Sequence, residues 1–231
     1  PPETKVMADA LRASGRDIIY SLSNNTPFEH AAAVSRLAHS WRTTGDITDT
    51  WSSMAGIGFA QNDHAKFAQP GCWNDPDMLV VGHVGWGPSL HPTKLTPNEQ
   101  YTHISLWCLL SSPLLIGCDL TKLDDFTTGL LTNDEVLEVN QDPLGKQATR
   151  LVQDGTTEVW AKPLVDGSWA VGLFNRGIIP ANASFDLGKL GLGSMVTVRD
   201  LWRQKDLPAQ SGTLKAKLPR HGCALFKVTG K

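Results

Sequence analysis

The sequence lacks the features that mark membrane proteins and nucleic-acid-binding proteins. Its longest apolar run spans residues 106–110, whereas a helix needs about 20 apolar residues to cross a bilayer. There is no cluster of lysine and arginine, and the formal net charge is −2. Neither nucleic acid nor an anionic membrane surface is therefore an expected partner. We expect a soluble globular protein.

Cysteine is scarce, and metal-ligand spacing is absent. The 231 residues include 4 cysteines, with no CxxC pair, so neither a zinc knuckle nor a disulfide framework is indicated. Buried free thiols are the expected state. The cysteines do not decide between an oxidising and a reducing compartment. The 7 histidines include no pair with the HExxH spacing of a metal site. We expect no metal and no other cofactor.

What the sequence does contain, up to residue 144, is an alternation of helix-like and strand-like segments. The expected strands are residues 18–22, 40–43, 77–81 and 114–116. Such strands, apolar almost throughout and separated by amphipathic helices, indicate a parallel sheet covered on both faces. Four strand–helix units fit in this part, and a full (β/α)8 barrel takes about 250 residues. The pattern predicts an α/β fold that is half of a TIM barrel.

The expected helices have recognisable ends. The first covers residues 2–14, with Gly15 closing it, and the second covers residues 29–40. A third runs from about residue 48 to 59, with Asp49 as its expected cap. Two capping boxes, Thr96 with Glu99 and Thr132 with Glu135, start later helices.

After residue 144 the pattern changes to short strands separated by turns. No helix template fits, and strands are expected at residues 158–161, 169–173, 196–199 and 224–228. This pattern is typical of an antiparallel β-sandwich. We therefore predict two domains: residues 1–144 as the half-barrel and residues 145–231 as the sandwich.

A half-barrel would leave two sheet edges and an open core, which favours aggregation over stability. The chain also begins Pro-Pro-Glu-Thr, with no initiator methionine. We therefore expect an N-terminal segment of about another half-barrel to belong with it.

In parallel barrels the working residues follow the carboxyl ends of the strands. Four predicted ends fall at residues 23–25, 42–46, 75–77 and 117–119, and polar or charged side chains gather there. This convergence predicts an active site that includes Asp46. A single carboxylate at a strand end could instead cap the next helix.

Two neighbouring features also have alternative interpretations. Arg42, four residues before Asp46, could bind ligand hydroxyl groups, lower the pKa of a carboxyl group, or form a plain salt bridge. Asp75-Pro76-Asp77 is rigid because of its proline, and its two carboxylates suit either catalysis or a structural hydrogen-bond hub. The sequence leaves these alternatives open.

Three segments closely resemble glycoside hydrolase family 27, the α-galactosidases (melibiases) and α-N-acetylgalactosaminidases. They are residues 40–51 (SWRTTGDITDTW), 71–79 (GCWNDPDML) and 140–147 (NQDPLGKQ). The resemblance covers essentially the whole chain but only the later part of the family's enzyme. It implies the second half of a (β/α)8 TIM barrel followed by an antiparallel β-sandwich. It also implies a retaining exo-glycosidase that hydrolyses terminal α-D-galactosyl residues by double displacement.

The resemblance assigns roles to individual residues. Asp46 would be the general acid/base, Arg42 would bind the sugar, Met78 would line the sugar pocket, and Asp77 would support it. The family's nucleophilic aspartate belongs to a Lys-Tyr-Asp-like motif at the end of the fourth strand. No segment of this chain matches that motif, so the nucleophile is expected to precede it.

One departure from the family bears on specificity. Where the family usually has Cys-Glu-Trp after the fifth strand, this chain has Ser23, Asn24 and Asn25. The family's disulfide at that cysteine is therefore not expected. The glutamate position often contacts the sugar's 2-position, which makes Asn24 a substrate-binding candidate. The alternatives are a β-L-arabinopyranoside, an α-N-acetylgalactosaminide, or a non-catalytic carbohydrate-binding homologue. A homo-oligomer is also left open.

Overall fold

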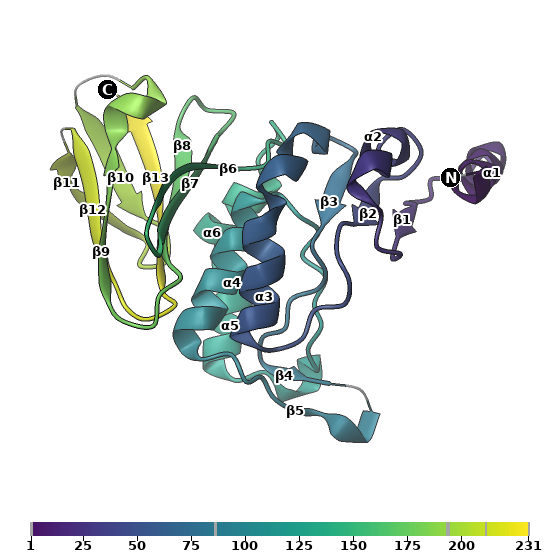
Figure 1. The fold of residues 1–231 in the computed structure, drawn as a ribbon, viewed down its shortest axis with the longest axis horizontal. Coiled ribbons are helices and arrows are strands. Elements are labelled where there is room, and N and C mark those ends of the chain that lie inside the picture. Colours follow the sequence, from purple (N-terminus) through teal and green to yellow (C-terminus); the bar gives the residue numbers. More distant parts are fainter. Residues whose placement is uncertain (1, 86, 193–194, 211, 231) are drawn as a thin grey trace.

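A computed structural model of the protein describes residues 2–85, 87–192, 195–210 and 212–230. A layer of helices stands between a small parallel sheet and a group of antiparallel strands (Figure 1). The helices of this layer are α3 (Trp51–Gly58), α4 (Pro97–Leu109), α5 (Asp125–Leu131) and α6 (Asp134–Gln141). Short 3-10 helices cover Phe28–His30, Phe59–Phe67, Gly87–Ser89, Leu120–Lys122 and Leu187–Leu190.

The parallel sheet has the order β1-β2-β3. Its strands are β1 (Ser21–Leu22), β2 (Ser40–Arg42) and β3 (Trp73–Asp75). Arg42 is in register with Asp75, so the last residues of β2 and β3 lie side by side. The predicted parallel pairing is confirmed, and it brings two charged residues to the same sheet edge.

The strand predicted at residues 77–81 is wrong in its position. β3 ends at Asp75 because Pro76 has no amide hydrogen and Asp77 turns the chain with a φ of 82°. Beyond that turn, Leu79 makes one isolated parallel bridge to Ile116. This bridge is also what remains of the strand predicted at residues 114–116. The hairpin β4 (His83–Val84) and β5 (His91–Pro92) follows it.

The capping box of α4 is confirmed, because the Thr96 amide donates to Glu99 Oε2 at 2.7 Å. The box predicted at Thr132 is wrong. The hydroxyl of Thr132 donates to Thr128 O at the end of α5, so Asn133 caps α6 instead.

Asp49 does not cap α3. Thr50 is the N-cap of that helix, and its side chain accepts from the Ser53 amide. Asp49 Oδ2 instead accepts from the amide of Lys94 at 2.9 Å. The carboxylate therefore ties the loop after β2 to the segment that leads into α4.

The first strand–helix unit is less buried than its sequence predicts. Helix α1 (Pro2–Ala13) forms as expected, but Val6 of its apolar face is 70% exposed. β1 is shorter than predicted, and Ile19 just before it is 80% exposed. The second predicted helix is reduced to α2 (Ala31–Val34) after a 3-10 turn. An apolar surface therefore lies open at this end of the molecule.

The predicted sandwich is confirmed as an architecture of two antiparallel sheets, ordered β11-β10-β13-β8-β7-β6 and β12-β9. Its strands are β6 (Thr149–Asp154), β7 (Thr157–Pro163), β8 (Trp169–Asn175), β9 (Ala181–Asp186), β10 (Val196–Asp200), β11 (Lys205–Gln210), β12 (Thr213–Leu218) and β13 (Cys223–Gly230). Strands β6, β9, β11 and β12 were not predicted from the sequence. The domain boundary after residue 144 stays a prediction, which limited proteolysis near Lys146 would test.

The helix layer and the sandwich share one apolar core. Trp107 of α4 and Phe174 of β8 belong to the same buried cluster. A Cβ atom on Gly172 would lie 2.5 Å from Leu109 Cδ1, so the glycine allows α4 to approach the sheet closely.

The 4 cysteines are free thiols, as expected, although Cys108 alone among them is fully buried. Within the described ranges, no helix combines the length and apolarity that a bilayer-spanning segment requires.

Candidate active site

The site is built around Arg42, the last residue of β2, which is only 7% exposed. Its Nη2 atom lies 2.8 Å from Asp77 Oδ2 and 3.2 Å from Asp46 Oδ1. A buried guanidinium needs nearby negative charge because its desolvation is costly. The three residues therefore form a charged cluster at the carboxyl edge of the parallel sheet.

Asp77 anchors this cluster to the surrounding backbone. Its two carboxylate oxygens accept from the amides of Ile47 and Met78, each at 2.8 Å. Its carbonyl accepts from Trp107 Nε1 at 2.7 Å, and its own amide donates to Asp75 Oδ1 at 2.8 Å. Asp77 thus acts as a hydrogen-bond hub, which favours the structural interpretation of the rigid aspartate pair.

Asp75 supports Asp77 through its carboxylate. It is 2% exposed, and burial raises its pKa, while the amide of Asp77 and the charge of Arg42 offset part of that rise. Its carbonyl also accepts from the Thr43 amide at 3.0 Å. These contacts are all with other residues of the protein, so Asp75 supports the site structurally.

Asp46 differs from the other two aspartates because its side chain is 95% exposed. In the part of the chain that the structure describes, its carboxylate has hydrogen-bond contact with Arg42 alone. The next residue, Ile47, is fixed through its amide to Asp77. Asp46 is thus an accessible acid on an anchored backbone, which is the geometry that proton transfer to a ligand requires.

Two further predicted residues lie near this cluster. The amide of Thr26 donates to Arg42 O at 2.9 Å, which places the loop carrying the exposed Asn24 beside the end of β2. Met78 follows Asp77 directly in the chain. Its Sδ atom packs closely against Gly117, because a Cβ atom on that glycine would lie only 2.6 Å from it. Arg42, Asp46, Asp77 and Met78 are thus brought together by direct contacts or adjacency, with Asn24 on the neighbouring strand end.

Trp107 was missed as a contributor to the site. The capping box predicted the helix that carries it, but its indole N–H also holds the turn at Asp77. A buried tryptophan needs an acceptor for this group. That requirement was the signal in the sequence for a hydrogen bond from Trp107, although the sequence does not reveal which carbonyl accepts it.

The donor groups of the site do not suit a metal ion. Across the described ranges, no group of three or more His, Cys, Asp or Glu side chains is arranged to hold one. The cluster offers instead a fixed cation and one accessible carboxylate, which suit the binding of hydroxyl groups and the transfer of a proton.

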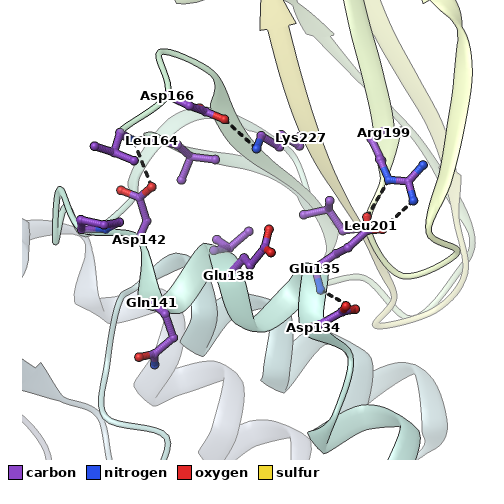
Figure 2. Close-up of a pocket in the computed structure, with 13 residues that line it drawn as sticks. Asp134, Glu135, Glu138, Gln141, Asp142, Leu164, Asp166, Arg199, Leu201 and Lys227 are labelled. Atoms are coloured by element: carbon purple, nitrogen blue, oxygen red, sulfur yellow. Dashed lines mark hydrogen bonds and ion pairs between the residues drawn. The ribbon is translucent and has the colours of Figure 1, made fainter.

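A second charged region lies where α6 meets the sandwich, around a cavity of about 610 Å³. Figure 2 shows that its charges are largely paired: Arg199 binds Glu135, and Lys227 binds Asp166. The Oδ2 atom of Asp142 accepts from the Val165 amide at 2.9 Å. These contacts join α6 to the sandwich, so we interpret this cavity as part of the domain junction.

Comparison with known proteins identifies the class to which this fold and site belong. Residues 3–142 match the family described as Alpha galactosidase A, and residues 154–228 match the alpha galactosidase C-terminal beta sandwich domain. The chain therefore belongs to the alpha-galactosidase (melibiase) family. The predicted fold, TIM-barrel strands and helices followed by a β-sandwich, is confirmed.

Individual relatives are similar over nearly all of this chain. Alpha-galactosidase 2 of Arabidopsis thaliana is 41% identical over 225 residues, which cover 96% of this chain and 54% of the relative. A GH27 β-L-arabinopyranosidase from Geobacillus stearothermophilus superposes with a TM-score of 0.93 at 33% identity, covering 99% of this chain and 53% of that one. A protein from Bacillus halodurans, titled a putative alpha-N-acetylgalactosaminidase, has a TM-score of 0.83 at 26% identity, with coverage of 99% and 54%. The chain spans about half the length of the curated relatives it matches.

Proposed function

We propose that this chain carries the acid/base part of a retaining exo-glycosidase that hydrolyses terminal α-D-galactosyl residues. The observation that carries the proposal is the exposed Asp46 carboxylate, held 3.2 Å from the buried Arg42 at the carboxyl edge of the sheet. Similarity to proteins named alpha-galactosidase, such as that of Arabidopsis thaliana, supports the choice of substrate.

In the proposed double displacement, Asp46 first protonates the departing glycosidic oxygen and then removes a proton from the incoming water. Arg42 binds sugar hydroxyl groups through its guanidinium, and Met78 forms an apolar wall of the sugar pocket. Asp77 keeps Arg42 and the backbone of Ile47 in place. No cofactor takes part in this scheme.

The nucleophile of such a mechanism is a second carboxylate about 5–5.5 Å from the first. We propose that it comes from an N-terminal segment that supplies the remaining barrel strands. Two observations support this: relatives are about twice as long, and Ile19 beside β1 is 80% exposed. That segment would also cover the open side of Asp46.

The sugar itself is the least constrained part of the proposal. The Geobacillus stearothermophilus neighbour is titled a β-L-arabinopyranosidase, and Asn24 replaces the glutamate that the family resemblance leads us to expect. A β-L-arabinopyranoside and an α-N-acetylgalactosaminide are therefore the alternative substrates. We assign Asn24 the role of contacting the sugar near its 2-position.

The test is a panel of nitrophenyl glycosides of the three sugars, applied to the full-length protein. Fastest release of nitrophenol from the α-galactoside supports the proposal. Faster turnover of the arabinopyranoside or the N-acetylgalactosaminide would keep the mechanism and change the substrate. Binding of galactose without turnover of any member of the panel would favour the non-catalytic, carbohydrate-binding alternative.

A further inference from the structure

One side chain of the sandwich reaches deep into the helix layer. His221, in the turn between β12 and β13, is 3% exposed. Its Nδ1 atom lies 2.6 Å from Glu99 Oε1. Its ring stacks on Trp51, with the ring centroids 3.9 Å apart and the planes 8° from parallel. Its carbonyl accepts from Thr102 Oγ1 at 2.7 Å. His221 is thus fixed by ring, side-chain nitrogen and backbone together.

Glu99 is the buried carboxylate that receives this histidine. Burial alone would raise its pKa, but the hydrogen bonds from His221 and from the Thr96 amide outweigh burial and hold the pKa below its ordinary value. The carboxylate is therefore ionised and acts only as an acceptor, so His221 donates through Nδ1. One oxygen of Glu99 binds the sandwich, and the other caps α4 at Thr96.

The two side-chain contacts of His221, with Trp51 and with Glu99, lead back to the loop that carries Asp46. Trp51 is the first residue of α3 and follows Asp46 by five positions. Between them, Asp49 binds the amide of Lys94, two residues before Thr96. The loop, the start of α4, Glu99, His221 and the start of α3 therefore form a closed circuit of contacts.

We propose that His221 is a positioning residue for Asp46, through which the β-sandwich fixes the acid/base loop. The proposal rests on the role assigned to Asp46 in the proposed function. Because Asp46 is mostly exposed and has a single hydrogen bond to Arg42 among the described residues, its placement depends on the backbone of its loop. That loop is anchored to Asp77 on the side of the barrel strands, to the Lys94 amide through Asp49, and at Trp51 on the side of the sandwich.

A histidine suits this position because two different contacts are made at once. Its flat ring covers Trp51, and its N–H group satisfies Glu99. His221→Phe keeps a flat ring and removes the hydrogen bond, while His221→Gln keeps a donor and removes the stacking. The matched control is Asp166→Asn, which alters a half-exposed ion pair elsewhere in the sandwich.

The first experiment compares kcat/KM for galactosides with poor and with activated leaving groups in the full-length protein. A misplaced acid slows mainly the substrate whose leaving group needs protonation. We expect both His221 variants to lose about tenfold to a hundredfold on the poor leaving group, with a loss of less than about threefold on the activated one. The control should retain both rates. Equal losses on both substrates would reduce His221 to a structural role and overturn the proposal.

The second experiment is independent of activity and measures amide hydrogen exchange. In both His221 variants the amides of Ile47 and Lys94 should exchange faster, because Ile47 itself and Asp49, the acceptor of the Lys94 amide, lie in the loosened loop segment. The amide of Arg150, which donates to Asn62 Oδ1, is the internal reference and should not change. Unchanged exchange at Ile47 and Lys94 overturns the coupling. Wild-type inactivity on every glycoside would instead count against the proposed function alone.

If His221→Phe does not fold, the double variant His221→Phe/Glu99→Gln removes the unpaired buried carboxylate and takes its place in both experiments. It should show the same selective loss on the poor leaving group and the same faster exchange. Wild-type values in a folded double variant would overturn the proposal.

Discussion

The two parts of this chain bury their apolar surface in different ways. The sandwich closes a core of its own between two sheets, where Val171, Phe185 and Leu214 are at most 1% exposed. The α/β part buries its helices against the sandwich on one side, whereas Val6 and Ile19 at the other end lie in solvent. Antiparallel strands pair with near neighbours in the chain, but parallel strands depend on distant segments. The sandwich is therefore the more self-sufficient part.

Both parts bury charge, but they place it differently. The α/β part holds the buried Arg42 between Asp77 and the exposed Asp46 at its sheet edge. The sandwich pairs the buried Glu158 with Arg176 and leaves Lys227 and Asp166 in a half-exposed pair. The cluster at the sheet edge combines a buried cation with an accessible acid, so we place the proposed chemistry there and give the sandwich a supporting role through His221.

The largest expected effect comes from removing the accessible acid. In the full-length protein, Asp46→Asn should lower turnover of galactosides with poor leaving groups by about 10²–10⁴-fold. Activated aryl galactosides should still react once and then stall at the covalent intermediate, because no general base activates water. Azide should rescue that step, and stopped-flow release of nitrophenol measures both phases.

Asp154→Asn is the control for this substitution, since Asp154 is an exposed carboxylate in the sandwich. It should leave both phases unchanged. Near-normal turnover of melibiose-type substrates by Asp46→Asn would contradict the assignment and make Asp75 or Asp77 the next candidate.

A second comparison sets the buried charge cluster against the exposed ion pair. Asp77→Asn keeps a residue that tolerates the positive φ of 82° but leaves Arg42 with a single carboxylate. We expect a loss of about 3–5 kcal/mol in the free energy of unfolding. The matched Asp166→Asn in the sandwich should cost at most about 1 kcal/mol. Urea denaturation of both variants measures the difference, and equal losses would remove the contrast between the two parts.

The sequence predicted those features of the fold that depend on neighbouring residues. The capping box at Thr96, the parallel sheet in the first part of the chain and the antiparallel sandwich follow from sequence pattern and were confirmed. The strand at residues 77–81 failed because a proline and a left-handed aspartate, with a partner as distant as Trp107, decide the path there. The prediction that α1 is covered on its apolar face failed, because amphipathicity does not reveal which segment covers a helix.

The candidate site was likewise predictable only where a local pattern in the sequence indicates the residue. Arg42 and Asp46 were identified from their place at a strand end, and the structure places them in contact. The circuit through His221 joins residues that are 122 positions apart. Neither periodicity nor a local motif carries such information, so this contact was beyond prediction from one sequence. The catalytic and binding roles of the individual residues stay predictions.

The third prediction concerns a buried lysine of the sandwich. Lys162 is fully buried and donates to Ser111 Oγ at 2.6 Å. Burial lowers its pKa from 10.5 to about 8. The unfolded chain then binds more protons between pH 8 and 10.5, so stability rises with pH across that window and the full penalty remains below pH 8. At pH 7, Lys162→Met should therefore gain up to about 3 kcal/mol, measured by urea denaturation. A loss of stability at pH 7 would contradict this.

The smallest expected effect concerns a buried histidine of the α/β part. His103 is fully buried on α4, and its Nε2 atom accepts from the Val80 amide at 3.0 Å. Burial lowers its pKa from 6.5 to about 3. Between pH 6.5 and 3 the unfolded chain binds a proton that the folded chain excludes, so this contribution to stability is lost as the pH falls. Whereas Lys162 makes the sandwich side more stable in base, His103 makes the α/β side less stable in acid.

His103→Gln keeps an acceptor for the Val80 amide and removes the titrating group. Between pH 7.5 and 5.5 the wild-type protein should lose about 1 kcal/mol more of its free energy of unfolding than this variant. The measurement is the urea midpoint at each pH, with the exposed His30→Gln as the control that should keep the wild-type slope. Parallel pH profiles for His103→Gln and the wild type would show that His103 is accessible to protons in the folded state. The acid sensitivity of the protein would then have to arise from carboxylates such as Glu99, whose lowered pKa acts in the same direction because its stabilising charge is lost as the pH falls.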